Sequence, residues 1–299
     1  MLDDQLAGLR NRDRLALARV LTLVSRGEHL SQIRAAVGPK PDATPVVAIT
    51  GNAGVGKSTL VGKLAEHLRS LGKSVAVLAC DPESPLTGGA LLGDRIRMPS
   101  RPDDAGLYIR SLAAASGHQA VAEHVDLMIR VLAAFGFDVI LLETVGAGQG
   151  DTAVRSLADV VVVLLQPESG DELQWEKAGL LEIADVVLIH KADLPGAERL
   201  ESQVKELLSL PGSREVAVLR ASSKQSQGLD TLWAAVERCP RRAGALEPAA
   251  QFLLRRAQQV LADRLLVRAG HVGPVVDRWK RHELDEEQAA DELLHLLIE

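Results

Sequence analysis

Three glycines, a lysine and a serine stand together in the stretch GNAGVGKS, residues 51–58. Their spacing matches GxxxxGK[ST], in which glycines let consecutive backbone N–H groups turn inward around an anion. Lys57 would reach the β- and γ-phosphates of a nucleotide, and the Ser58 hydroxyl would coordinate Mg²⁺. The apolar run PVVAIT precedes the stretch and a helical pattern follows it, as this chemistry requires. The predicted phosphate site consists of Gly51, Asn52, Ala53, Gly54, Val55, Gly56, Lys57, Ser58 and Thr59.

Carboxylates end two further apolar runs and are candidates for a metal site. Glu143 closes the run FDVILLE, and Asp81 follows VAVLAC. Carboxylates at strand ends that face the phosphate loop can hold Mg²⁺ directly or through water. Asp94, in the Pro- and Gly-rich stretch 80–98, either belongs to this metal shell or forms a surface ion pair with a neighbouring arginine. The predicted metal ligands are Ser58, Asp81, Asp94 and Glu143.

The stretch VGAGQGD, which follows Glu143, is typical of a loop at a γ-phosphate. Gly146 would let the backbone approach that phosphate, because glycine has no side chain to keep it away. Gln149 is either a water-orienting residue or a solvated loop residue. No residue stands out as a strong general base. The stretch 80–98 suits a switch that orders on the γ-phosphate and loosens after hydrolysis.

The stretch LIHKAD, residues 188–193, predicts a base-reading loop, because it ends an apolar run at the edge where parallel sheets bind ligands. Asp193 would accept from guanine N1–H and the N2 amino group, whereas adenine presents neither donor in that arrangement. Lys191 would lay its aliphatic stem along the base. Ser222 and the Ser223 backbone N–H would contact the other edge. The alternative is a strand end with two charges in solvent.

His190 stands where a guanine-reading loop usually has Asn. A neutral His donates one hydrogen bond, so we expect it to contact guanine N7 and to lose the second contact that ties the base loop to the phosphate loop. One such neutral bond contributes about 0.5–1.5 kcal/mol. The expected loss of affinity is therefore several-fold to roughly tenfold, without a change of base preference.

The elements that position these residues follow from hydrophobic patterning. Continuous apolar runs are typical of strands covered on both faces, and amphipathic helices intervene. The runs are VVAIT, VAVLAC, VILLE, VVVVLL, VVLIH and VAVLRA. We predict an α/β fold with a doubly wound, largely parallel sheet. One or two helices are expected before the linker GPKPDATP, and a long and a shorter helix after RRAGALEPAA. The expected division is 1–40 for N-terminal helices, 41–240 for a P-loop GTPase domain and 241–299 for a helical arm that packs on a partner subunit.

Composition narrows the classes of partner. The formal net charge is −6 and aromatic residues are 2%, which argues against nucleic acid as a partner. No apolar run approaches the length of a membrane span, and the charged N-terminus is unlike a signal peptide. Two cysteines without metal-ligand spacing fit a reducing compartment, so a cytoplasmic location is expected.

With these motifs the chain resembles the GTPase chaperones of adenosylcobalamin-dependent methylmalonyl-CoA mutase, once described as lysine, arginine and ornithine transport ATPases, within the SIMIBI class of P-loop GTPases. The resemblance rests on DPESPLTGGALLGDRIRM, LLETVGAGQGD, GDELQWEKAGLLEIADVVLIHKAD and SSKQSQGLDTLW. It implies a homodimer with a C-terminal dimerisation arm. It also implies slow Mg²⁺-dependent GTP hydrolysis, with GDP as product, that the mutase accelerates. The implied role is to gate cofactor delivery to the mutase and to protect it.

The resemblance also implies a mobile loop over 170–177 that couples nucleotide state to the mutase and places Lys177 among the catalytic residues. Ala178 departs from this family pattern, in which a second Lys is usual, and Ser223 stands where Ala is usual. Two other functions stay open. One is a GTPase for nickel insertion, which needs Cys/His clusters that the His spacing does not supply. The other is a nucleotide-gated interaction module with negligible turnover. An ATP-driven transport component is disfavoured, because Asp193 has no role opposite adenine.

Overall fold

The computed structural model describes residues 2–82, 104–114, 121–145, 151–167, 180–209, 216–240, 257, 261 and 269–295. The chain divides into two compact units, Met1–Ala243 and Gly244–Glu299, and each is described by itself.

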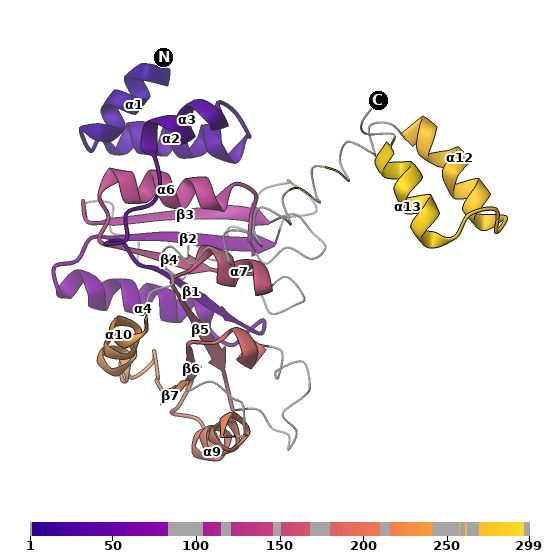
Figure 1. Cartoon of the computed structure of the whole chain (residues 1–299). Coiled ribbons are helices and arrows are strands. Elements are labelled where there is room, and N and C mark those ends of the chain that lie inside the picture. The colour runs from indigo at the N-terminus through magenta and orange to yellow at the C-terminus, as the bar shows by residue number, and fades with distance from the viewer. Residues whose placement is uncertain are drawn as a thin grey trace. The chain divides into compact units, whose positions relative to one another are not determined.

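Seven parallel strands of the first unit form one sheet in the order β3-β2-β4-β1-β5-β6-β7 (Figure 1). The strands are β1 (Val46–Gly51), β2 (Val75–Pro82), β3 (Leu107–Ala114), β4 (Val139–Glu143), β5 (Val160–Leu165), β6 (Val186–Ile189) and β7 (Ala217–Arg220). The chain runs outward from β1 to β3, returns through β4, and then continues from β5 on the other side of β1. The reversal of direction lies at the carboxyl end of β1, the position at which open α/β sheets bind ligands.

The helices are α1 (Leu2–Arg10), α2 (Arg14–Ser25), α3 (Leu30–Val37), α4 (Lys57–Ser70), α6 (Val125–Phe135), α7 (Asp151–Leu157), α9 (Ala197–Leu208), α10 (Leu229–Arg238), α12 (Ala269–Lys280) and α13 (Glu286–His295). Helices α4 and α10 cover one face of the sheet, whereas α6, α7 and α9 cover the other, and α1–α3 pack outside α6 (Figure 1). Alternate residues of β1 enter the two cores: Val46 and Ala48 on the α6 side, Val47 and Ile49 on the α4 side. The continuous apolar runs are therefore explained by burial on both faces.

All six predicted apolar runs are strands, and among the described residues one further strand, β3, was missed. β3 lies at the edge of the sheet and pairs only with β2. Leu107 and Leu112 are buried, but Tyr108 and Ile109 are only half-buried. An edge strand needs no continuous apolar run, so the pattern that identified the other strands is absent here.

The prediction of one or two N-terminal helices was wrong, because the structure has three. The first break is at Arg12, whose φ of 58° ends α1, followed by Asp13, whose carboxylate caps α2 by accepting from Leu15 N at 2.8 Å. The second break is at Gly27, with a φ of 73°. Local turn chemistry thus divides a segment with one helical period.

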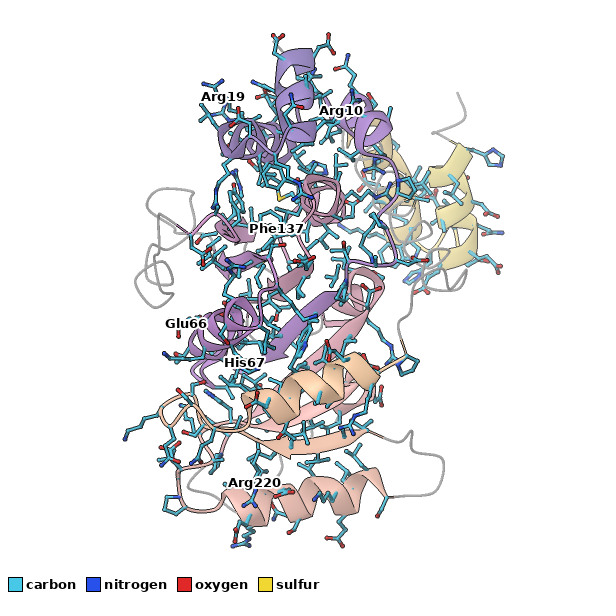
Figure 2. The ribbon with its side chains drawn as sticks, turned by 90° about the vertical axis from the view of Figure 1, so that its left-hand side faces the viewer. Arg10, Arg19, Glu66, His67, Phe137 and Arg220 are labelled. Atoms are coloured by element: carbon cyan, nitrogen blue, oxygen red, sulfur yellow. The ribbon has the colours of Figure 1, made fainter. Side chains whose placement is uncertain are left out.

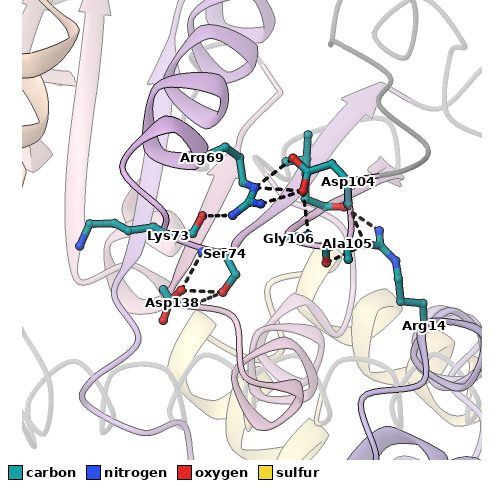
Figure 3. Close-up of polar contacts among 9 residues, drawn as sticks. Arg14, Arg69, Lys73, Ser74, Asp104, Ala105, Gly106 and Asp138 are labelled. Atoms are coloured by element: carbon teal, nitrogen blue, oxygen red, sulfur yellow. Dashed lines mark hydrogen bonds and ion pairs between the residues drawn. The ribbon is translucent and has the colours of Figure 1, made fainter.

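Two arginines join the N-terminal helices and α4 to the entry of β3 (Figure 3). Arg14 of α2 donates to the backbone carbonyls of Asp104, Ala105 and Leu107 at 3.0, 2.9 and 2.6 Å. Arg69 of α4 grips the Asp104 carboxylate, with Nη2 to Oδ1 at 2.8 Å and Nε to Oδ2 at 3.0 Å. The turn before β3 is therefore held from both sides.

The other edge of the sheet is held by ion pairs. Arg220 of β7, labelled in Figure 2, pairs with Glu198 and Glu201 of α9 at 3.0 and 2.9 Å. Both carboxylates raise the pKa of Arg220 above its ordinary value. α9 is thereby fixed beside the last strand.

The second unit contains the two consecutive helices α12 and α13. An ion pair between Arg278 and Glu292, at 2.7 Å, joins them. The predicted linker 241–250 lies outside the described residues, as does most of the predicted long helix that begins near 253. Within the ranges that the structure describes, no helix combines the length and apolar character needed to cross a bilayer.

Candidate nucleotide site

The predicted phosphate loop lies between β1 and α4, at the carboxyl end of β1. Lys57 is the first residue of α4 and is 9% exposed. Its Nζ donates to the carbonyl oxygens of Gly51 at 2.9 Å and Asn52 at 3.2 Å. The ammonium therefore lies against the start of the loop, and Lys57 itself begins a helix, whose N-terminus favours anions.

At two glycines of the loop, neighbouring atoms leave no room for a Cβ. At Gly51, with φ of 145°, a Cβ would come within 2.6 Å of the Leu164 carbonyl oxygen of β5. At Gly56, with φ of 98°, a Cβ would come within 2.6 Å of His190 Cε1. Gly56 thus has both a left-handed backbone and a ring packed against it, so any other residue type would strain the backbone and displace the ring.

The predicted metal ligands Ser58 and Glu143 lie next to each other. The Ser58 hydroxyl donates to Glu143 Oε1 at 2.7 Å, and Glu143 is 2% exposed at the end of β4. A hydroxyl and a carboxylate are hard oxygen donors, so this pair fits Mg²⁺. Among the residues that the structure describes, no three or more His, Cys, Asp or Glu side chains gather at one metal position.

Several predicted site residues lie outside the described residues. They are Asp94, Gly146, Gln149 and Lys177. The backbone of Asp81 is placed near the end of β2, in register with Ala113 of β3, and its side chain is outside the description.

The predicted base loop follows β6 and contacts the phosphate loop directly. Lys191, with a φ of 57°, extends its Nζ to the Gly54 carbonyl at 2.9 Å and to Gln166 Oε1 at 2.6 Å. The His190 backbone N–H donates to the Leu165 carbonyl at 2.7 Å. The lysine side chain therefore reaches from the base loop to the phosphate loop.

The expectation that His190 loses the tie between the two loops was wrong. His190 is 3% exposed, and its Nδ1 lies 2.8 Å from the Val55 carbonyl oxygen of the phosphate loop. Its Nε2 lies 2.8 Å from Ser223 Oγ. The imidazole is longer than an Asn side chain and carries a nitrogen on each side, so it bridges both elements. Burial lowers the pKa of His190 and keeps the ring neutral at pH 7.

The predicted base readers Asp193 and Ser222 are joined. The Ser222 hydroxyl donates to Asp193 Oδ1 at 2.6 Å, and this bond lowers the pKa of Asp193. Ser222 also exchanges two backbone hydrogen bonds with Gln227, which close the loop after β7. The Asp193 carboxylate is therefore ionised at neutral pH and held in one orientation.

Two further residues of this edge were missed from the sequence. Gln166 follows β5 and accepts from Lys191, and Thr144 follows β4 and donates from Oγ1 to Thr50 Oγ1 at 2.9 Å. Both residues directly follow buried strands, and a polar residue at that position is the sequence feature that could have identified them.

Comparison with known proteins places the chain in a family of GTPases. The model of the methylmalonyl-CoA mutase-associated GTPase family, MeaB, matches residues 17–271. A homologue from Pyrococcus abyssi (strain GE5 / Orsay) is 34% identical over 315 aligned positions, which cover 100% of this chain and 97% of that protein. GTPase ArgK of Escherichia coli (strain K12) is 32% identical over 247 positions, covering 79% of this chain and 75% of ArgK.

Two other matches are a solved structure with the same fold and a longer protein, part of which is similar to this chain. The crystal structure of a LAO/AO transport system kinase superposes with a TM-score of 0.73 at 23% identity, covering 100% of this chain and 98% of that one, and shows the same fold. A fused isobutyryl-CoA mutase of Nocardia farcinica (strain IFM 10152) is 40% identical over 202 positions, which are 66% of this chain and 19% of that protein.

The chain belongs to the methylmalonyl-CoA mutase-associated GTPase family; it is a P-loop GTPase that binds guanine nucleotides and hydrolyses GTP.

Proposed function

We propose that this member of the family binds GTP at the carboxyl edge of its sheet and serves as a chaperone for an adenosylcobalamin-dependent acyl-CoA mutase. In that role it gates loading of the cofactor and protects the mutase from inactivation. Support comes from the Nocardia farcinica relative, which is named as a fused isobutyryl-CoA mutase. A segment similar to this chain accounts for 19% of that protein. Two activities joined in one chain elsewhere are good candidates for contact when they are separate chains.

One observation carries the location of the nucleotide: the phosphate loop and the base loop are bonded to each other. Lys191 reaches Gly54, and His190 reaches Val55, at 2.9 and 2.8 Å. Phosphates at the first loop and a guanine at the second would be held by one connected framework. The proposed nucleotide-binding residues are those predicted from the sequence: residues 51–59, Gly146, His190, Lys191, Asp193, Ser222 and Ser223.

Lys57 is the proposed electrostatic centre of hydrolysis. In the reaction a water oxygen bonds to the γ-phosphorus, the bond to the β–γ bridging oxygen breaks, and GDP and phosphate leave. The Lys57 ammonium now donates to two loop carbonyls and would exchange these for phosphate oxygens as charge develops on them. Gln149 and Lys177 are the other proposed catalytic residues.

Ser58 and Glu143, with Asp81 and Asp94, are the residues proposed to hold Mg²⁺. When bound, Mg²⁺ neutralises charge on the β- and γ-phosphate oxygens. The chain's own contribution is to orient the ligands: the Ser58 hydroxyl is pinned by Glu143, which is itself buried.

The proposal includes a homodimer formed through segment 241–299. Residues 1–40 are then the N-terminal helices and residues 41–240 the GTPase domain. The proposed location is the cytoplasm. The compact units separate between Ala243 and Gly244, close to the proposed boundary. Among the described residues of α12 and α13, only Val275 is a buried hydrophobic residue, whereas Trp279 is 42% exposed. This exposed apolar side chain, together with the single buried one among the described residues, supports a partner surface that covers the two helices.

Single-turnover GTP hydrolysis with and without an adenosylcobalamin-dependent acyl-CoA mutase from the same organism tests the proposal. We expect the mutase to accelerate hydrolysis and to co-purify in a nucleotide-dependent way. Unchanged hydrolysis together with GTP-dependent binding would assign the chain to nucleotide-gated interaction modules. Absence of both effects would refute the mutase role while leaving the GTPase activity in place.

A further inference from the structure

The side chain of His190 is enclosed by parts of the chain that are far apart in sequence. Both of its ring nitrogens lie 2.8 Å from protein oxygens, Val55 O and Ser223 Oγ. The ring edge lies so close to Gly56 that a Cβ there would meet Cε1 at 2.6 Å. His190 is 3% exposed and Ser223 is 5% exposed. The ring therefore contacts the phosphate loop twice and the loop after β7 once.

The partners determine which nitrogen carries the proton. The Val55 carbonyl is only an acceptor, so Nδ1 must be the N–H of a neutral ring. Nε2 is then an acceptor, and the Ser223 hydroxyl donates to it. Nδ1–H donates to the Val55 carbonyl, and Nε2 accepts from the Ser223 hydroxyl. Neither ring nitrogen therefore has a proton left to donate to a ligand.

We propose that His190 and Ser223 form a positioning pair that sets the width of the guanine pocket without contacting the base. The inference rests on the proposed guanine site and changes the role of two of its residues. Lys191 follows His190 in the chain, and Ser222 precedes Ser223. A bond from His190 to each neighbouring loop therefore fixes the separation of Lys191, Asp193 and Ser222 from the phosphate loop.

The specific consequence concerns guanine N7. If His190 donated to N7, its removal would abolish any preference for GDP over 7-deaza-GDP, which has a carbon at that position. A positioning residue affects both nucleotides alike. We expect His190→Phe, which keeps a flat ring without nitrogens, to weaken both nucleotides about tenfold and to leave their affinity ratio unchanged. A ratio that changes in this variant overturns the proposal.

Coupling between the two residues is the second test. Ser223→Ala should weaken GDP roughly two- to tenfold, because Nε2 loses its donor. The double variant should bind GDP no more weakly than His190→Phe, since the shared bond can be lost only once. Losses that multiply would show two independent residues and refute the pair. Ser226→Ala, at an exposed serine of the same loop, is the matched control and should bind like the wild type.

The tautomer gives a readout that does not depend on affinity and that needs no substitution. Nitrogen-15 NMR of the His190 ring should show protonated Nδ1 and unprotonated Nε2, both in the free protein and with GDP bound. Protonated Nε2 in the GDP complex would mean contact with the base and would overturn the inference. Equal binding of GDP and ADP by the wild type would instead refute the proposed guanine site itself, so the two failures are distinguishable.

Discussion

The Ser222 hydroxyl donates to the Asp193 carboxylate at 2.6 Å, across 29 positions of sequence. The bond orients the carboxylate that we propose selects the base. It also lowers the pKa of Asp193 below its ordinary value of 3.8, because donation to the charged form favours ionisation. If Asp193 reads the base as proposed, the Ser222 hydroxyl links base selection to the pH dependence of nucleotide binding.

Ser222→Ala should shift the pH dependence of GDP binding. A carboxylate with a depressed pKa stays ionised above that value and loses its charge only as the pH falls through it. Without the hydroxyl the pKa rises toward 3.8, so affinity should begin to fall at a higher pH than in the wild type. Carboxyl carbon-13 NMR of Asp193 and GDP titrations at decreasing pH measure this. An unchanged pKa in Ser222→Ala would contradict the assigned cause.

Asp193→Asn should change the base that is selected. The amide side chain can donate to the C2 carbonyl of xanthine, whereas it cannot accept both donors of guanine. We expect GDP affinity to fall roughly ten- to hundredfold, with xanthosine diphosphate then preferred. Parallel titrations with GDP, ADP and xanthosine diphosphate measure the order. Retention of GDP preference in this variant would place the base elsewhere.

The sequence predicts those features of the site that depend on local order along the chain. The phosphate loop, the strand-end acid Glu143 and the base loop each follow a continuous apolar run, so their place at one sheet edge could be inferred. The link between His190 and Ser223 could not, because the residues are 33 positions apart and each departs separately from the family pattern. β3 was missed for a related reason: its place as an edge strand depends on pairing with β2 and not on its own apolar pattern.

Gly56→Ala should destabilise the protein more than Gly72→Ala. Both positions have positive φ, 98° and 79°, so alanine strains the backbone at each. At Gly72 nothing lies within 4 Å of a Cβ, whereas at Gly56 the His190 ring must move. We expect the free energies of unfolding to differ by about 1–3 kcal/mol, the usual cost of overpacking. Urea unfolding of both variants gives the difference, and equal values would mean that the ring moves aside freely.

Arg69→Lys should loosen the turn before β3. The guanidinium contacts both oxygens of Asp104 and also donates from Nη1 to the Lys73 carbonyl at 2.6 Å, geometry that a single ammonium cannot reproduce. The expected loss of unfolding free energy is about 1–3 kcal/mol, typical of a charged hydrogen bond that is partly shielded from water. Asp104→Asn should cost a similar amount, and the double variant should cost less than the sum. Strict additivity in thermal or urea unfolding would show that the contact contributes nothing.

Trp279→Glu tests whether α12 and α13 meet another copy of the chain. Trp279 is 42% exposed and Leu294 is 46% exposed in a unit where, among the described residues, Val275 is the buried hydrophobic side chain. A glutamate would place a charge on the surface that the proposed dimer buries, and a buried unpaired charge is strongly unfavourable. The variant should therefore dissociate at higher concentration than the wild type in light scattering, while GDP affinity is unchanged. Leu15→Glu is the matched control, because Leu15 is 58% exposed on α2 of the other unit and lies outside the proposed dimer surface. A wild-type chain that is monomeric at all concentrations, or a Trp279→Glu variant that dimerises as the wild type does, would refute this surface.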